Sequence, residues 1–221
     1  MTYRKVPLIK NNLYHIINKS IAGFRIFNSG SDYKRMMDTI IFYSIKQPAC
    51  RFSWFKEFHK DEYNFIEYFR KNYSKKLIDI ITYCLMPTHI HFILKELKED
   101  GISKYMNLIL MSYSRYFNLK HHRKGPLWEG RFKNILIETD EQFIHLTRYI
   151  HINPVKARLV SKPEEWNHSS YNEYIGANEK SESLCNFSEY LNRDCLSYKE
   201  FVDAEIDYKR NFKIIKHLIL E

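Results

Sequence analysis

The chain contains few of the residues that mark flexible linkers or cross-linked folds. Its 221 residues include only 6 glycines, 6 prolines and 4 cysteines. The cysteines, which show no CxxC spacing, are Cys50, Cys84, Cys185 and Cys195. This pattern argues against a zinc ribbon or a disulfide framework and favours reduced thiols, as in a cytoplasmic protein.

Long hydrophobic runs are also absent. The longest, residues 77–86, is interrupted by Asp79 and Thr82, whereas a membrane-spanning helix needs roughly 20 apolar residues. The N-terminal residues lack the apolar stretch that signal peptides carry. We therefore expect a cytoplasmic protein without a membrane segment. A hydrophobic content of 44% nevertheless supports a buried core and excludes disorder as the main state.

Positive charge is in excess and unevenly distributed. Lys and Arg number 35 against 26 Asp and Glu, a formal net charge of +9. Residues 1–160 carry 27 basic and 14 acidic side chains, whereas residues 161–221 carry 8 and 12. The excess favours an anionic partner, whose kind the charge alone does not tell. We divide the chain into a basic domain, 1–160, and an acidic, helical C-terminal extension, 161–221.

Apolar runs and turn residues predict a mixture of strands and helices. The expected strands are residues 13–18, 77–86, 89–94 and 132–139. The expected helices are residues 31–45, part of 51–74, 101–119, 141–152 and 154–159. Ser31 or Asp32 would cap the first helix, Asp140 would cap the helix from 141, and Asn153–Pro154 would end it. This order predicts an α+β fold in which helices pack on an antiparallel sheet.

Two histidines form the sharpest chemical feature. His89 and His91 are two residues apart on an expected strand, so their side chains point to the same face. Two imidazoles in that arrangement can chelate one divalent metal ion. Solvent-facing or hydrogen-bonded histidines are the alternative interpretation, because no third Cys or His ligand is evident from the spacing.

A tyrosine and an asparagine share one face of the helix expected at 141–152. Tyr149 and Asn153 are four residues apart, which places them one turn from each other. A phenol has an ordinary pKa of about 10 and needs help to act as a nucleophile, for example from a metal ion that polarises the electrophile. Ordinary packing is the alternative, since the chain has 17 tyrosines; Tyr113 and Tyr116 are rival candidates.

A glycine-containing loop, residues 125–133, follows a basic turn at 121–124. Its glycines allow close approach to a phosphate, its cations neutralise one, and Trp128 could stack on a base. Trp128 could equally be a plug in the core. The candidate DNA-contacting residues are Arg115, Lys120, Arg123, Lys124, Trp128, Arg131 and Lys133.

These motifs together resemble a known family. In order, the chain reads YHIINKSIAGFRIFNSGSDYKRMM, YCLMPTHIHFIL, KGPLWEGRFKN, HLTRYIHINPVKARLV and WNHSSY. Over roughly residues 10–175 it resembles the single-tyrosine HUH transposases, in particular the REP-associated tyrosine transposases of the IS200-like superfamily. Pro87–Thr88 departs from the family's usual Pro-Asn, and Thr88 keeps a polar side chain there.

The resemblance implies a fold and a reaction. It implies a ferredoxin-like antiparallel sheet with helices mainly on one face, and a site in which His89, His91 and Asn153 bind Mg²⁺ or Mn²⁺. Tyr149 is implied to attack single-stranded DNA beside a hairpin, forming a 5′-phosphotyrosine and a free 3′-OH. Trp128, Arg131 and Lys133 would contact the DNA, and a homodimer is possible. No motif implies a role for residues 176–221, whose acidity suits a partner, a dimer contact or a cover over the basic domain.

Three other functions remain open. A domesticated relative would bind hairpin DNA without cutting it, although His89, His91, Tyr149 and Asn153 are all present. A metal-dependent phosphoesterase using water as the nucleophile would need further ligands near the histidines. A Rep-like replication initiator would be expected to carry a helicase or primase domain.

Overall fold

A four-stranded antiparallel sheet forms the centre of the structure. The computed structural model describes residues 6–45, 51–58, 76–177, 183–191 and 195–204. The strands are β1 (Leu13–Lys19), β2 (Ile78–Met86), β3 (His89–Glu96) and β4 (Lys133–Ile137). Their order is β2-β3-β1-β4, with every neighbouring pair antiparallel. All four predicted strands are therefore confirmed, with bounds within two residues.

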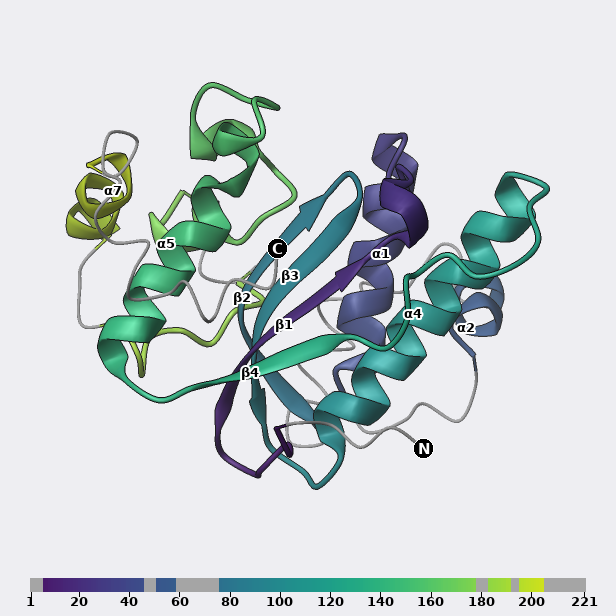
Figure 1. Cartoon of the computed structure of the whole chain (residues 1–221), viewed down its shortest axis with the longest axis horizontal. Coiled ribbons are helices and arrows are strands. Elements are labelled where there is room, and N and C mark those ends of the chain that lie inside the picture. The colour runs from purple at the N-terminus through teal and green to yellow at the C-terminus, as the bar shows by residue number, and fades with distance from the viewer. Residues whose placement is uncertain (1–5, 46–50, 59–75, 178–182, 192–194, 205–221) are drawn as a thin grey trace.

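Helices cover both faces of the sheet (Figure 1). They are α1 (Gly30–Tyr43), α2 (Phe52–Phe58), α4 (Gly101–Lys120), α5 (Asp140–Lys156), α6 (Tyr171–Tyr174) and α7 (Cys195–Asp203). The α+β class is confirmed. The helices α1 and α4 pack on one face, as the resemblance implied, and α5 covers the opposite face. The rest of the helix expected within 51–74 lies outside the described residues.

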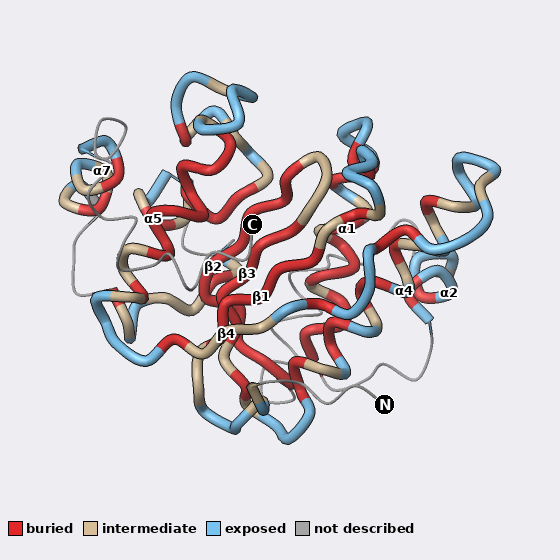
Figure 2. The backbone as a smooth tube through the Cα atoms, viewed as in Figure 1, coloured by how far each residue is buried: buried red, intermediate tan, exposed pale blue. Residues whose placement is uncertain are grey.

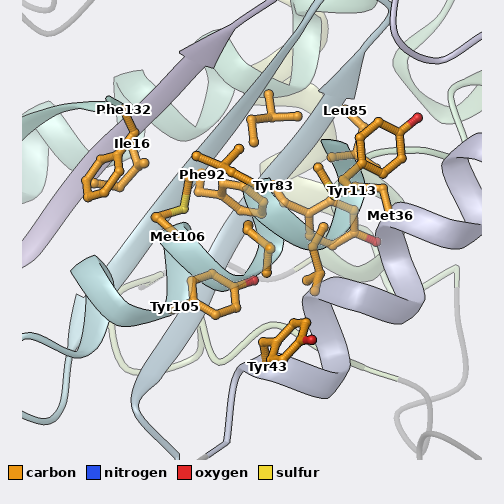
Figure 3. Packing of buried hydrophobic residues seen from close by; sticks show 14 of the residues in the cluster. Ile16, Met36, Tyr43, Tyr83, Leu85, Phe92, Tyr105, Met106, Tyr113 and Phe132 are labelled. Carbon is orange, nitrogen blue, oxygen red and sulfur yellow. The ribbon is translucent and has the colours of Figure 1, made fainter. Parts of the chain in front are cut away.

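Alternation along the strands sends side chains to two cores. Ile16 and Phe92 face α1 and α4, where they pack in one cluster with Met36, Met106 and Tyr113 (Figure 3). The residues between them on the same strands face α5 instead. On that face Ile93 and Ile137 pack with Leu146 and Ile150 of α5.

The outer edge of β2 is covered by chain from the C-terminal part. The amide of Leu85 donates to the carbonyl of His168 at 2.9 Å, and the amide of Ser170 donates to the carbonyl of Tyr83 at 3.0 Å. Figure 2 accordingly shows β2 buried along its length, although it is an edge strand. Such cover removes an exposed pairing edge. The division at residue 160 stays a prediction, but the residues after it are not separate from the sheet.

Two helix starts and one helix end differ from the sequence prediction. Ser29, not Ser31 or Asp32, is the N-cap of α1, because Asp32 accepts the Ser29 amide at 3.0 Å and so occupies the third helical position. Thr139, not Asp140, caps α5 and accepts from the amide of Gln142 at 3.1 Å.

The helix α5 does not end at Asn153–Pro154 but runs on to Lys156. Pro154 lies in the last turn and has no amide hydrogen to donate to the carbonyl of Ile150, four residues earlier. The carbonyl of Asn153 still accepts from the amide of Ala157 at 2.9 Å, so the helix continues past the proline. None of the helices in the described part of the chain is long and apolar enough to span a membrane.

Gly101 is required by close packing where α4 begins. A Cβ built there would overlap the carbonyl oxygen of Leu77, a backbone atom that cannot swing aside. Gly101→Ala should therefore lower the free energy of unfolding by about 1–3 kcal/mol, measured by urea titration. Gly30→Ala, at the first residue of α1 with open space around it, is the matched control. Equal stabilities for the two variants would contradict this assignment.

Candidate active site

The two histidines of β3 lie side by side on the face of the sheet that α5 covers. Their ring centroids are 4.8 Å apart and the rings are nearly perpendicular, at 82°. His91 is fully buried, paired with Ile17 of β1 and Cys84 of β2, whereas His89 at the start of the strand is partly exposed. One histidine of the pair, His91, is therefore buried in the sheet, and the other, His89, is accessible.

The helix α5 brings Tyr149 and Asn153 to these histidines. Nδ2 of Asn153 lies 3.1 Å from Nε2 of His91. The Tyr149 ring stands edge-on to His91, with centroids 6.1 Å apart and an interplanar angle of 87°. The four residues singled out from the sequence thus form one cluster, although His91 and Asn153 are 62 residues apart in the chain. Their chemical roles stay predictions.

A cavity of about 620 Å³ opens beside this cluster. His89, Tyr149 and Asn153 line it, together with Lys19 and Glu129. Since β1 ends at Lys19 and β3 begins at His89, the cavity lies at one end of the central strands. It is open enough to admit a phosphate and part of a nucleotide.

Sequence reasoning missed Lys156, which also lines the cavity and places its ammonium 5.5 Å from the centroid of the Tyr149 ring. The signal was its spacing, seven residues after Tyr149 and therefore on the same helix face. Because the helix was predicted to end at Asn153–Pro154, Lys156 was not placed on it. Glu129 belongs to the motif KGPLWEGRFKN, but nothing in the sequence showed that this loop lies close to His89.

Thr88, the residue that departs from the family pattern, contacts His89 directly. Its Oγ1 lies 2.9 Å from Nδ1 of His89. A hydrogen bond at that nitrogen helps to fix the orientation of the ring. Thr88 therefore performs an orienting task in the turn between β2 and β3.

The donors in this cluster suit a divalent cation. Within the described ranges, no three His, Cys, Asp or Glu side chains converge to hold a metal ion. A cation here would therefore take two imidazole nitrogens and the amide oxygen of Asn153. Such a mixed nitrogen and oxygen set is compatible with Mn²⁺ and, with more water or phosphate oxygens, with Mg²⁺.

The rival tyrosines lie on α4, which packs on the other face of the sheet. Tyr113 is fully buried and donates to the carbonyl of Ile26, and burial raises the pKa of its hydroxyl. Tyr116 donates to Asp32 Oδ1 at 2.9 Å. The structure brings neither of them to His89 and His91.

The candidate DNA-contacting residues fall into two groups. Arg131 and Lys133 are exposed and line a smaller cavity that shares Lys19 and Glu129 with the one beside Tyr149. Trp128 is only 8% exposed, and its Nε1 donates to the carbonyl of Leu110 at 3.3 Å. Trp128 is thus a core residue, and its indole ring is too buried to stack on a base.

The other cations of the prediction lie elsewhere, on α4 and the turn after it. Arg115 and Lys120 line a separate cavity between α1, α2 and α4. Lys120 donates to Asp32 Oδ1 at 2.6 Å and ties α4 to the start of α1. Arg123 donates to Asn118 and to the carbonyl of Pro126, and Lys124 is exposed.

The far side of α5 is anchored by a buried histidine. Nδ1 of His151 lies 2.7 Å from the Tyr198 hydroxyl of α7, and its Nε2 lies 2.8 Å from Oγ of Ser170. Burial lowers the pKa of His151 to about 3, so the ring is neutral at ordinary pH and uses one nitrogen as donor and the other as acceptor. The anchor joins the helix of Tyr149 to the C-terminal part of the chain.

Comparison with known proteins gives the family. The model of the family described as "Transposase IS200 like" matches residues 39–153, just over half of the chain. The chain belongs to the IS200-like transposase family. The matched region contains His89 and His91 as well as Tyr149 and ends at Asn153, so it spans the whole cluster described above.

Two relatives agree with this membership. A REP-associated tyrosine transposase of Haemophilus influenzae is 25% identical over 128 residues, which cover 52% of this chain and 73% of that protein. The solved structure of a REP-associated tyrosine transposase bound to a REP hairpin superposes with a TM-score of 0.53 at 17% identity, covering 85% of this chain and 94% of that one. At that identity the structural match shows a common fold.

The hydroxyl of Tyr198 should contribute to stability through His151. Tyr198→Phe removes the hydroxyl and leaves a buried nitrogen of His151 without this partner, a loss of about 1–3 kcal/mol in the free energy of unfolding. Tyr171→Phe is the matched control, because the Tyr171 ring also packs edge-on against His151 but its hydroxyl has no hydrogen bond within the described residues. Urea unfolding in which both variants lose the same stability would count against the anchor.

Proposed function

We propose that this IS200-like transposase cleaves and rejoins single-stranded DNA next to a hairpin, with Tyr149 as the nucleophile. The observation that carries the proposal is the convergence of Tyr149, His89 and Asn153 on one open cavity, with the buried His91 in contact with His89 and Asn153. Hairpin DNA as the partner is supported by the solved relative, which was determined with a REP hairpin bound. The basic balance of residues 1–160 suits such a partner.

The reaction is a transesterification. The Tyr149 oxygen attacks the scissile phosphorus and loses its proton, and the bond from phosphorus to the 3′ oxygen breaks. The departing oxygen takes up a proton and leaves as a 3′-OH, while the 5′ phosphate stays on Tyr149. Attack on this phosphotyrosine by another 3′-OH reverses the step and joins two strands. Each step exchanges one phosphodiester for another, so no nucleotide cofactor is consumed.

Lys156 supports the nucleophile electrostatically. Its ammonium lies 5.5 Å from the centroid of the Tyr149 ring, and a cation at that place attracts the negative charge of a phenolate. Being exposed on the last turn of α5, Lys156 also meets the incoming phosphate. It therefore favours both the ionised nucleophile and the bound substrate.

We propose Mg²⁺ or Mn²⁺ as the cofactor, held by His89, His91 and the amide oxygen of Asn153. When bound, the ion supplies polarisation of the non-bridging phosphate oxygens. The protein's own part is to hold three donors in place from a strand and a helix. A site with few protein oxygens binds weakly by itself, so we expect the DNA phosphate to strengthen it.

Lys19, Arg131 and Lys133 mark the path of the DNA beside the nucleophile. They line the two cavities that meet at Glu129. A strand laid along them would place its phosphates near three cations and one of them near Tyr149. This placement favours Arg131 and Lys133 over the α4 cations as contacts of the scissile strand.

Covalent capture of the DNA by the protein distinguishes cleavage from binding without cleavage. Single-stranded DNA carrying hairpins with randomised flanks is labelled at its 3′ end, because that fragment keeps the 5′ phosphate that joins the protein. Wild-type protein with Mn²⁺ should give a labelled protein band on a denaturing gel, and Tyr149→Phe should reduce it at least about 1,000-fold. Tyr116→Phe is the control and should keep it.

The other outcomes identify the alternatives. Cleavage that persists in Tyr149→Phe without a protein-linked band would indicate water as the nucleophile. Tight hairpin binding by the wild type with no cleavage of any flank would indicate a non-cutting relative. Either result would overturn the proposed reaction.

Arg131 should contribute one phosphate contact. Arg131→Ala should weaken binding of single-stranded DNA and reduce the slope of log K against log salt by about 0.7. Lys104→Ala removes the same charge near the start of α4, which follows the end of β3 farthest from His89, and should leave the slope unchanged. Fluorescence anisotropy between low and moderate salt measures both. Identical slopes for the wild type and Arg131→Ala would remove Arg131 from the DNA path.

A further inference from the structure

A third histidine, His15, lies next to His91 in the sheet. His15 of β1 is fully buried, as is His91. In the antiparallel pairing of β1 with β3, Ile17 stands opposite His91 and His15 opposite Ile93. His15 is therefore the diagonal neighbour of His91 on the same face, the face that α5 covers. Its neighbours on that face, Leu13 and Ile17, are apolar, so a buried imidazole there needs a polar partner.

His91 is that partner. Nε2 of His15 lies 3.1 Å from Nδ1 of His91, and the two rings are nearly parallel, at 8°. Only one hydrogen fits between two nitrogens at this distance, so one ring donates and the other accepts. The direction of this bond decides which nitrogen of His91 carries its proton.

The two directions have opposite consequences for a metal ion. If His91 donates from Nδ1, its Nε2 keeps a lone pair on the side of Asn153. If His15 donates, a neutral His91 carries its proton on Nε2 and cannot coordinate a cation there. The structure favours the first direction, because the amide nitrogen of Asn153, which is a donor, faces Nε2 of His91 at 3.1 Å.

We propose that His15 is a positioning residue that accepts the Nδ1 proton of His91 and so leaves a lone pair on Nε2, the nitrogen that would bind the cation. The inference rests on the proposed function, since it takes His91 to be a metal ligand. A carboxylate or a carbonyl usually performs this task behind a ligating histidine. Here a neutral imidazole performs it from the neighbouring strand, without placing a charge in the sheet.

The tautomer can be measured without metal or DNA. In protein labelled with ¹⁵N-histidine, long-range ¹H–¹⁵N correlation spectra distinguish the two neutral forms of each ring. We expect His91 to be protonated on Nδ1 in the wild type and to shift toward Nε2 protonation in His15→Phe. A wild-type His91 protonated on Nε2 would overturn the proposal.

Metal affinity gives the second readout. His15→Phe fills the space but accepts no hydrogen bond, and should weaken Mn²⁺ binding about 10- to 100-fold by calorimetry. His15→Gln offers a carbonyl oxygen and should restore most of the affinity, which a merely structural role would not explain. Thermal unfolding of both variants confirms that the fold is kept.

The outcomes separate this proposal from the proposed function. If His15→Phe binds Mn²⁺ as the wild type does, while the wild type still forms the covalent DNA adduct, only the role of His15 is wrong. If the wild type shows no Mn²⁺ binding that His89→Ala removes, the metal site and the role of His15 both fail. If Mn²⁺ binding depends on His15 but no adduct forms, the metal site stands and the transposase reaction fails.

Discussion

The packing of α5 on the sheet determines whether the residues of the candidate active site come together. Leu146 and Ile150 of α5 pack against apolar residues of the strands, such as Ile93 and Ile137. This contact determines which side of the helix faces the sheet. Successive residues of a helix point about 100° apart, so a shift of one residue would turn Tyr149 and Asn153 away from His91. Ordinary apolar packing thus fixes the geometry on which the proposed chemistry depends.

The acidic C-terminal part also helps to hold α5 in this position. His151 joins α5 to Ser170, and Ser170 is bonded to the edge of β2. On the same side, His151 meets Tyr198 of α7, and Arg148 donates to the carbonyl of Phe201 at 3.2 Å. Residues 176–221, for which no motif implied a role, therefore help through Tyr198 and Phe201 to brace the helix that carries Tyr149.

The sequence was most informative where periodicity is simple. Apolar runs bounded by turn residues predicted the strands, and two-residue spacing placed His89 and His91 on one face. Spacing could not reveal the contact of His15 with His91, because it depends on the register of two strands 76 residues apart. The end of α5 was predicted wrongly because Pro154 disrupts an isolated helix more than one already packed on a sheet. Trp128 stayed ambiguous because an aromatic residue in a basic loop suits a base or a core equally well.

The most direct test of the account is to locate the covalent bond to DNA. Trypsin cleaves after Arg148 and Lys156 and releases the peptide YIHINPVK, in which Tyr149 is the sole tyrosine. Wild-type protein reacted with hairpin DNA and Mn²⁺ is digested with nuclease and trypsin and analysed by mass spectrometry. The account predicts residual nucleotide on this peptide and on its tyrosine. Nucleotide on any other tyrosine-containing peptide would contradict it.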